Sequence, residues 1–241
     1  MPRMLIRRHH RQEKRSSAPS PSRGTGLPLR LVRLYLGLVL YGASGALQLR
    51  AGLGLGPWDV FHQGVARHTG LSIGTVAIVV GAAVLLLWIP LRERPGLGTV
   101  SNVVVVGLAM DATLFLAPEV RGTALRAALL GFAVALNGLA TGLYISARFG
   151  AGPRDGLMTR LHELTGRSVR LVRTSIEVTV LVCGCLLGGS AGIGTVVYAL
   201  AIGPLAQAFL RLFGFSPRPE RAGRTRRSAG PGLRARAILR R

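Results

Sequence analysis

Six long apolar runs alternate with shorter polar segments along the chain. Each run comes close to the roughly 20 residues that a helix needs to cross the hydrocarbon core of a bilayer. The predicted spans cover residues 31–49, 73–91, 99–117, 124–147, 170–188 and 195–213. Thr99 and Thr195 each follow a glycine and are suited to cap the third and the sixth span. The pattern therefore predicts an all-α membrane protein with six transmembrane helices.

A second pattern shows that the chain contains an internal repeat. The motif Gly54-Leu55-Gly56-Pro57-Trp58-Asp59 returns as Gly150-Ala151-Gly152-Pro153-Arg154-Asp155, an offset of 96 residues (54 to 150). The same offset relates Thr69-Gly70 to Thr165-Gly166 and Gly96-Leu97-Gly98-Thr99 to Gly192-Ile193-Gly194-Thr195. Self-similarity at one fixed offset indicates a repeated structural unit. We expect residues 30–115 and 126–211 to be two copies of a three-helix unit.

Each copy of the motif precedes a segment that is too polar to cross a bilayer. Gly56 and Gly152 can cap a helix, whereas Pro57 and Pro153 suit its first position. An aspartate follows in the first turn, where the helix dipole favours negative charge. Apolar residues then fall on one face and polar residues on the other. We predict a short amphipathic helix in each copy, ended by the glycine of Thr-Gly, which lies in or folds back into the membrane interface.

The formal charge of +22 is concentrated at the two ends of the chain. Residues 1–29 form a basic tail rich in Ser, Pro and Gly that we predict to be disordered, and residues 214–241 form a second basic tail. Such charge could indicate nucleic-acid binding. Basic tails beside membrane spans are better explained by anionic lipid headgroups on the cytoplasmic side, and we expect no nucleic-acid partner.

Arginines in the loops predict how the chain is oriented in the plasma membrane. The loop after the fourth predicted span, together with the first residues of the fifth, carries six arginines: Arg148, Arg154, Arg160, Arg167, Arg170 and Arg173. The equivalent loop after the first span has only two, and the bias is reversed in the next loop of each copy. The loops after the second and fourth spans and both termini are therefore predicted to be cytoplasmic. Three spans per copy then place the second copy upside down, which is the inverted-topology repeat found in many secondary transporters.

In this order and in both halves, the Gly-x-Gly-Pro-x-Asp motif, the Thr-Gly-x-Ser helix end and the later Gly-x-Gly-Thr resemble the YczE/YyaS/YitT group of bacterial integral membrane proteins. The likeness is greatest to YczE-like members and covers about residues 30–213. The resemblance implies a multi-span plasma-membrane protein. It implies no catalytic residues, and Arg154, which stands where the first copy has Trp58, departs from a symmetric pattern.

Polar residues within the predicted spans are candidates for a substrate site, because ionisable groups are costly at membrane depth. Asp111 in the third span matches Gln207 in the sixth, and Asn137 lies in the fourth. Hydrogen bonds between helices would explain these residues equally well. Asp59 and Asp155 have the same two interpretations: cap chemistry, or a helix start directed at a substrate or a coupling ion.

Enzymatic activity is not expected from this sequence. The glycines at 52, 54 and 56 lack the spacing and the preceding strand of a dinucleotide site. Gly42-Ala43-Ser44-Gly45 is similar to a rhomboid-protease motif, but no histidine lies in a predicted span to act as base. We expect no cofactor and no metal. The leading hypothesis is a small-molecule or ion transporter, the alternative is a membrane scaffold that acts through partner proteins, and a homo-oligomer is left open.

Overall fold

The computed structural model describes residues 26–213, and all regular structure within this range is helical. The predicted tails fall outside it, apart from residues 26–29. The helices are α1 (Leu27–Ala51), α2 (Pro57–Thr69), α3 (Ile73–Leu86), α4 (Trp88–Leu91), α5 (Leu97–Leu116), α6 (Thr123–Ser146), α7 (Pro153–Thr165), α8 (Val169–Leu186) and α9 (Ile193–Leu212). The first helix begins four residues before the predicted span, so the end of the predicted N-terminal tail is helical.

Five stretches of residues 26–213 are long and apolar enough to cross a membrane: α1, α3 with α4, α5, α6 and α9. The sixth predicted span, 170–188, does form a helix, α8. That helix carries Arg170, Arg173 and Glu177 in its first half, and it is not among the five. The all-α architecture and its membrane helices are as predicted, and the role of α8 as a sixth span stays a prediction.

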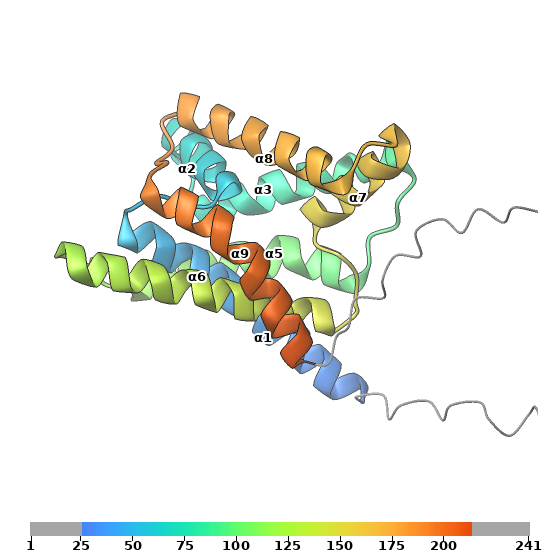
Figure 1. Ribbon diagram of the computed structural model, residues 1–241, viewed down its shortest axis with the longest axis horizontal. Helices are drawn as coiled ribbons and strands as arrows, with labels where there is room; N and C mark the ends of the chain where they lie inside the picture. The colour runs from blue at the N-terminus through green and yellow to red at the C-terminus, as the bar shows by residue number, and fades with distance from the viewer. Residues whose placement is uncertain (1–25, 214–241) are drawn as a thin grey trace, which may run out of the picture.

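The helices are arranged in two layers (Figure 1). In one layer α1 packs along α6, with α5 against α1 and α9 against α6. In the other layer α2 packs along α8, and α7 contacts both α3 and α8. Contact between α3 and α5 joins the layers. Helix α2 of the first predicted copy thus packs mainly on α8 of the second, so neither copy forms a separate bundle.

Glycines allow the close approach of the long helices. Gly138 and Gly142 on α6 face Leu205 and Phe209 of α9, and a Cβ atom added at either glycine would come within 2.8 Å of a side-chain atom. At the contact between α1 and α5, a Cβ atom on Gly42 would meet the backbone of α5. Small residues at such crossings are typical of helix packing in lipid, where van der Waals contact supplies much of the association energy.

Two pairs of contacts connect the halves at the 96-residue offset. The Gly98 amide donates a hydrogen bond to the Phe149 carbonyl at 2.9 Å, and the Gly194 amide donates to the Leu53 carbonyl at 2.8 Å. Each loop before an amphipathic helix is therefore fixed by the first turn of a long helix from the other half.

Arginine side chains make the second pair. Arg30 Nε donates to the Ala147 carbonyl at 3.1 Å, and Arg126 Nε donates to the Ala51 carbonyl at 2.6 Å. Both carbonyls lie at helix C-termini, where they lack a partner within the helix and where the dipole favours a cation. Each arginine thus caps the long helix of the other half.

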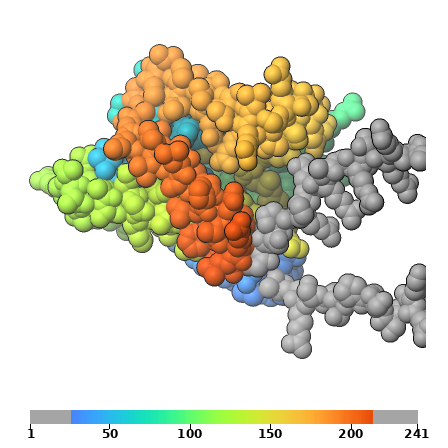
Figure 2. Space-filling view, in the orientation of Figure 1, coloured from blue at the N-terminus to red at the C-terminus, as the bar shows by residue number. Residues whose placement is uncertain are grey.

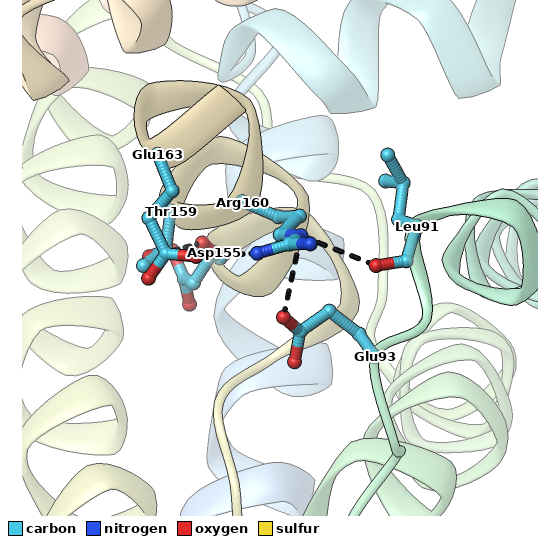
Figure 3. A network of polar contacts seen from close by, with 6 residues as sticks. All are labelled: Leu91, Glu93, Asp155, Thr159, Arg160 and Glu163. Carbon is cyan, nitrogen blue, oxygen red and sulfur yellow. Dashed lines mark hydrogen bonds and ion pairs between the residues drawn. The ribbon is translucent and has the colours of Figure 1, made fainter. Parts of the chain in front are cut away.

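The amphipathic helices hold the turns of the opposite half in a similar way. Figure 3 shows Arg160 of α7 reaching the Leu91 carbonyl at 3.1 Å and the Glu93 carboxylate at 3.6 Å. On the other side, Arg67 of α2 donates to the carbonyl of Gly188, just after α8. Trp88 Nε1 donates to the carbonyl of Pro153 at 3.2 Å, which fixes the start of α7 against α4.

Candidate functional site

The two amphipathic helices begin as the sequence predicts. Gly56 and Gly152 are the N-caps, and Pro57 and Pro153 are the first helical residues. Each helix ends at a glycine with left-handed backbone, Gly70 and Gly166. Pro at the start and Gly after the end follow from local backbone preference, because proline lacks the amide that an N-terminus leaves unpaired.

At the first position of each motif the backbone conformation and the lack of space both require glycine. Gly54 and Gly150 have φ angles of 114° and 119°, which side-chain-bearing residues rarely adopt. A Cβ atom at these positions would also lie 2.8 Å from the hydroxyls of Thr195 and Thr99, respectively. The loops can therefore pass close to the starts of α9 and α5 only with glycine.

Thr99 and Thr195 cap their helices from the third helical position of a capping box and not as the N-cap residues. Helices α5 and α9 begin two residues earlier, with Gly96 and Gly192 as N-caps. The Thr99 hydroxyl accepts a hydrogen bond from the Gly96 amide at 3.2 Å and donates one to the Ala151 carbonyl at 2.7 Å. The threonine thus joins the start of α5 to the motif of the second half.

The starts of α2 and α7 meet at a polar cavity of about 70 Å³. Helices α1, α8 and α9 supply the other walls, and Figure 2 shows atoms of α2, in cyan, at the bottom of a hollow between α8 and α9. The lining residues are Tyr41, Gly56, Pro57, Trp58, Asp59, Arg154, Asp155, Met158, Arg173, Glu177 and Tyr198. Both predicted aspartates line one space, although 96 residues separate them.

Arg154 lies at the centre of this region. Its guanidinium is 4.5 Å from the centroid of the Trp58 ring, a cation–π arrangement. The side chain lines the main cavity and two neighbouring ones, of about 70 and 30 Å³. These two residues occupy equivalent positions of the repeated motif, so the copies touch at a position where one has a cation and the other an aromatic ring.

His62 connects Arg154 to Asp59. Its side chain is 1% exposed, with Nδ1 3.3 Å from Asp59 Oδ1 and Nε2 3.4 Å from Arg154 Nη2. A guanidinium can only donate, so Nε2 must accept and the proton lies on Nδ1, facing the carboxylate. The imidazole is therefore neutral.

The pKa directions agree with this assignment. Burial lowers the pKa of His62, and the Arg154 charge lowers it further, which together outweigh the opposing effect of Asp59. For Asp59, burial raises the pKa, but the His62 contact and the Arg154 charge outweigh burial and leave the pKa below its usual value. The three side chains thus form a carboxylate–neutral imidazole–guanidinium chain.

Asp155 has different surroundings. Its Oδ2 accepts a hydrogen bond from the Tyr144 hydroxyl at 2.9 Å. The aspartate lines both the main cavity and a second cavity of about 70 Å³, whose walls include Tyr41, Asn102 and Tyr144. The rings of Tyr41 and Tyr144 meet edge to face, with centroids 6.2 Å apart. Asp155 therefore lies between two small spaces with aromatic walls.

Asn137 lies behind the cavity wall rather than in it. It is buried, donates through Nδ2 to the Ser44 hydroxyl at 2.7 Å, and accepts through Oδ1 from the Tyr198 hydroxyl at 3.3 Å. This chain joins α1, α6 and α9 and orients Tyr198, which does line the cavity. In the same region, Arg173 and Glu177 of α8 form the ion pair expected from their spacing, at 2.8 Å.

Asp111 and Gln207 lie away from the cavity. Asp111 Oδ1 accepts from the Gly74 amide at 2.8 Å, and Oδ2 accepts from the Ser72 hydroxyl at 2.5 Å. The carboxylate thus stabilises the N-terminus of α3, a helix-cap role supplied by another helix. Gln207 is exposed on α9. These two repeat-equivalent residues are not brought together with Asp59 and Asp155.

Sequence reasoning passed over several residues of the site, namely Tyr41, His62, Tyr144, Arg154 and Tyr198. One signal was available, because Arg154 breaks an otherwise symmetric motif. His62 gave no such signal, since its contact with Arg154 depends on how α2 and α7 meet. Within residues 26–213 no group of three or more His, Cys, Asp or Glu side chains could hold a metal ion, and Cys183 and Cys185 are free and exposed on α8.

Comparison with known proteins identifies relatives over most of this region. Residues 28–211 match the model of a family described as "Family of unknown function (DUF6198)". An uncharacterized protein of Haemophilus influenzae is 39% identical over 187 residues, covering 76% of this chain and 84% of the relative. The uncharacterized membrane protein YczE of Bacillus subtilis is 34% identical over 180 residues, covering 73% and 83%.

A second Bacillus subtilis relative, the uncharacterized protein YyaS, is 26% identical over 182 residues, which is 73% of this chain and 89% of the relative. No solved structure matches the chain. All three matches cover more than four fifths of the relative, so the likeness extends over nearly the whole of each protein.

Proposed function

This chain belongs to the DUF6198 family together with YczE-like membrane proteins, and on that premise we propose that it is a small membrane transporter that binds its solute in the cavity between α2 and α7. The observation that carries the proposal is the convergence of both Gly-x-Gly-Pro-x-Asp helix starts on one polar space. In transporters with inverted repeats, interrupted helices direct their ends at a substrate near the repeat interface.

The charges around this cavity support a ligand rather than a purely structural role. Buried ionisable side chains destabilise a membrane protein unless they are paired, and those that persist commonly line a solute pathway. Asp59 and Arg154 come from two helices and line the same space, and His62 lies between them behind the wall. An apolar interior would pack such a bundle at lower cost, so selection for binding explains the polar residues better.

We propose an inverted-topology arrangement of the two copies, with α8 as the sixth span. The crossed contacts support it: Gly98 with Phe149, and Gly194 with Leu53, are the same hydrogen bond at the 96-residue offset. In this arrangement both termini are cytoplasmic, and α2 and α7 lie at opposite sides of the membrane.

One difference between the halves supports alternating access. Helices α3 and α5 meet so closely that a Cβ atom on Gly107 would lie 2.5 Å from the Gly74 carbonyl oxygen. At the equivalent Gly203 of α9, an added Cβ atom would have no neighbour within 4 Å among the described residues. Helix α3 thus packs more tightly on α5 than α8 does on α9, where Figure 2 shows a hollow. Exchange of these two packings would open the opposite side.

The topology can be tested directly. Reporter fusions after residues 95, 160 and 225 should score as cytoplasmic, and fusions after residues 65, 120 and 190 as external. The arrangement requires opposite sides for 65 and 160, because these residues belong to equivalent amphipathic helices. A cytoplasmic signal at residue 65 would overturn the inverted repeat.

Transport itself requires a comparison of strains and variants. Uptake and efflux of a panel of small solutes should differ between a deletion strain and one that overexpresses the protein. Asp59→Asn and Asp155→Asn should abolish that difference at normal membrane abundance, whereas the matched control Asp111→Asn should preserve it. Normal flux in the Asp59→Asn, Asp155→Asn double variant would remove the cavity from the mechanism. Loss of the strain difference on deletion of the tails alone would instead favour a scaffold.

A further inference from the structure

The two aspartates of the cavity differ in the charges that face them. Asp59 has His62 Nδ1 at 3.3 Å, and the Arg154 charge acts on it. The 96-residue offset relates His62 to Met158 and Arg154 to Trp58, and both Met158 and Trp58 line the cavity beside Asp155. The groups that would correspond to the polar partners of Asp59 are therefore a thioether and an indole, neither of which carries charge.

Asp155 consequently keeps a single side-chain partner, the Tyr144 hydroxyl. Within residues 26–213 no Arg, Lys or His nitrogen forms an ion pair with it. The aspartate is also accessible, because it lines two cavities and is exposed. A carboxylate in such a position has room beside it for a positively charged group.

The cavity as a whole has an excess of negative charge. Three carboxylates line it, from Asp59, Asp155 and Glu177, against the two guanidinium groups of Arg154 and Arg173. His62, behind the wall, is neutral because its Nε2 accepts from the Arg154 guanidinium. Glu177 is paired with Arg173, and the Arg154 charge acts on Asp59. Asp155 is therefore the carboxylate without an ion pair, because Arg173, whose charge also interacts with it, is paired with Glu177.

The walls of this space suit an organic cation rather than a bare metal ion. The rings of Tyr41, Trp58 and Tyr198 line the main cavity, and Tyr144 lines the second. Aromatic faces attract ammonium and guanidinium groups, and a carboxylate adds a charge-assisted hydrogen bond. The chain itself supplies one example, since the Arg154 guanidinium rests on the Trp58 ring.

We infer that the cavity binds a small organic cation with an ammonium or guanidinium head, which donates to Asp155 and lies against the surrounding aromatic rings. The inference rests on the proposed function, because it names the class of solute for the same site. An anion would meet the excess negative charge, and an apolar solute would leave Asp155 unmatched. Arg154 sets the selectivity by occupying the Asp59 side of the cavity, so that one cation, not two, is accepted.

The test is a titration of the purified full-length protein by calorimetry. Methylammonium and guanidinium chloride should each bind saturably, and sodium chloride and sodium acetate at equal ionic strength should not. Asp155→Asn should weaken binding about tenfold or more, as expected for loss of a charge-assisted hydrogen bond. Glu163→Gln, on the same helix but outside the cavity, is the matched control and should bind like the wild type.

A second variant covers the case in which Asp155→Asn does not fold. Met158→Lys would place a tethered ammonium beside Asp155 and should abolish binding of added cations while leaving the carboxylate in place. Undiminished binding in Met158→Lys, or equal binding of sodium or acetate, would overturn the inference.

Flux through proteoliposomes separates this inference from the proposed function. Cation binding without flux would sustain the inference and contradict the transporter. Flux of a different solute, with no cation binding, would sustain the transporter and contradict the inference.

Discussion

The guanidinium of Arg154 lies 4.5 Å from the centre of the Trp58 ring, and these two residues hold the same position in the two copies of the motif. Contact between equivalent positions is expected where two repeats meet at a local two-fold axis. Because one copy has a cation there and the other an aromatic ring, the contact is attractive and the cavity around it is asymmetric.

This contact should be measurable by a double-mutant cycle. Arg154→Ala and Trp58→Leu should each destabilise the purified protein, and their coupling energy should be about 1 kcal/mol, as for a partly desolvated cation–π pair. Thermal or denaturant unfolding in detergent provides the free energies. Arg154→Lys should recover part of the coupling, because it keeps the charge but loses the planar stacking. Additive single effects would show that the pair contributes no interaction of its own.

Stability should fall on acidification because of His62. Its pKa is below the ordinary value of 6.5 in the folded protein, so the unfolded chain binds the proton more readily. The stabilisation is complete above the ordinary pKa and is lost as the pH falls through the folded pKa. We expect the melting temperature to decrease between about pH 7 and pH 5.

His62→Gln is the matching control for this pH effect. A glutamine can still accept from Arg154 and donate toward Asp59, but it does not titrate. Its melting temperature should change less over the same pH range. Protonation of Asp59 destabilises the protein only at a lower pH, because the pKa of this carboxyl is below 3.8. A wild-type profile as flat as that of the variant would contradict the neutral, buried imidazole.

Asp111 should behave as a helix cap and not as a transport residue. Asp111→Ala removes the acceptor for the Gly74 amide and the Ser72 hydroxyl and should cost about 1–2 kcal/mol of unfolding free energy. Asp111→Asn keeps an acceptor and should cost less than half as much. Both variants should retain flux in proportion to their membrane abundance. A stable but inactive Asp111→Asn protein would return this residue to the list of functional candidates.

Arg126 and Arg30, which cap the long helices, should contribute unequally to the free energy of unfolding. Arg126 donates to Ala51 and Gly52 carbonyls at 2.6 Å each, whereas Arg30 makes longer bonds, of 3.1 and 3.2 Å, to Ala147 and Arg148. Charge-assisted bonds of normal length contribute about 1.5–3 kcal/mol. We expect Arg126→Ala to destabilise the protein by about 2 kcal/mol and Arg30→Ala by less. Unfolding of both variants in detergent, with the exposed Arg121→Ala as control, would rank them.

Much of the fold is determined by the sequence alone, because the relevant forces act locally. Long apolar runs specify the membrane helices through the length that a bilayer requires. Gly56-Pro57 and Gly152-Pro153 specify where α2 and α7 begin, and Thr-Gly specifies where they end, since capping depends on neighbouring backbone groups. The repeat in the sequence also indicates that Asp59 and Asp155 occupy equivalent positions.

Only the tertiary structure decided which polar residues share a site. Asp111 and Asp155 look alike in sequence, yet one stabilises the N-terminus of α3 and the other lines a cavity, because different helices pack against them. His62 and Trp58 meet Arg154 only because α2 and α7 pack together in the folded chain. Such contacts join segments about 90 residues or more apart, and their geometry depends on the packing of several helices at once, which no local pattern encodes.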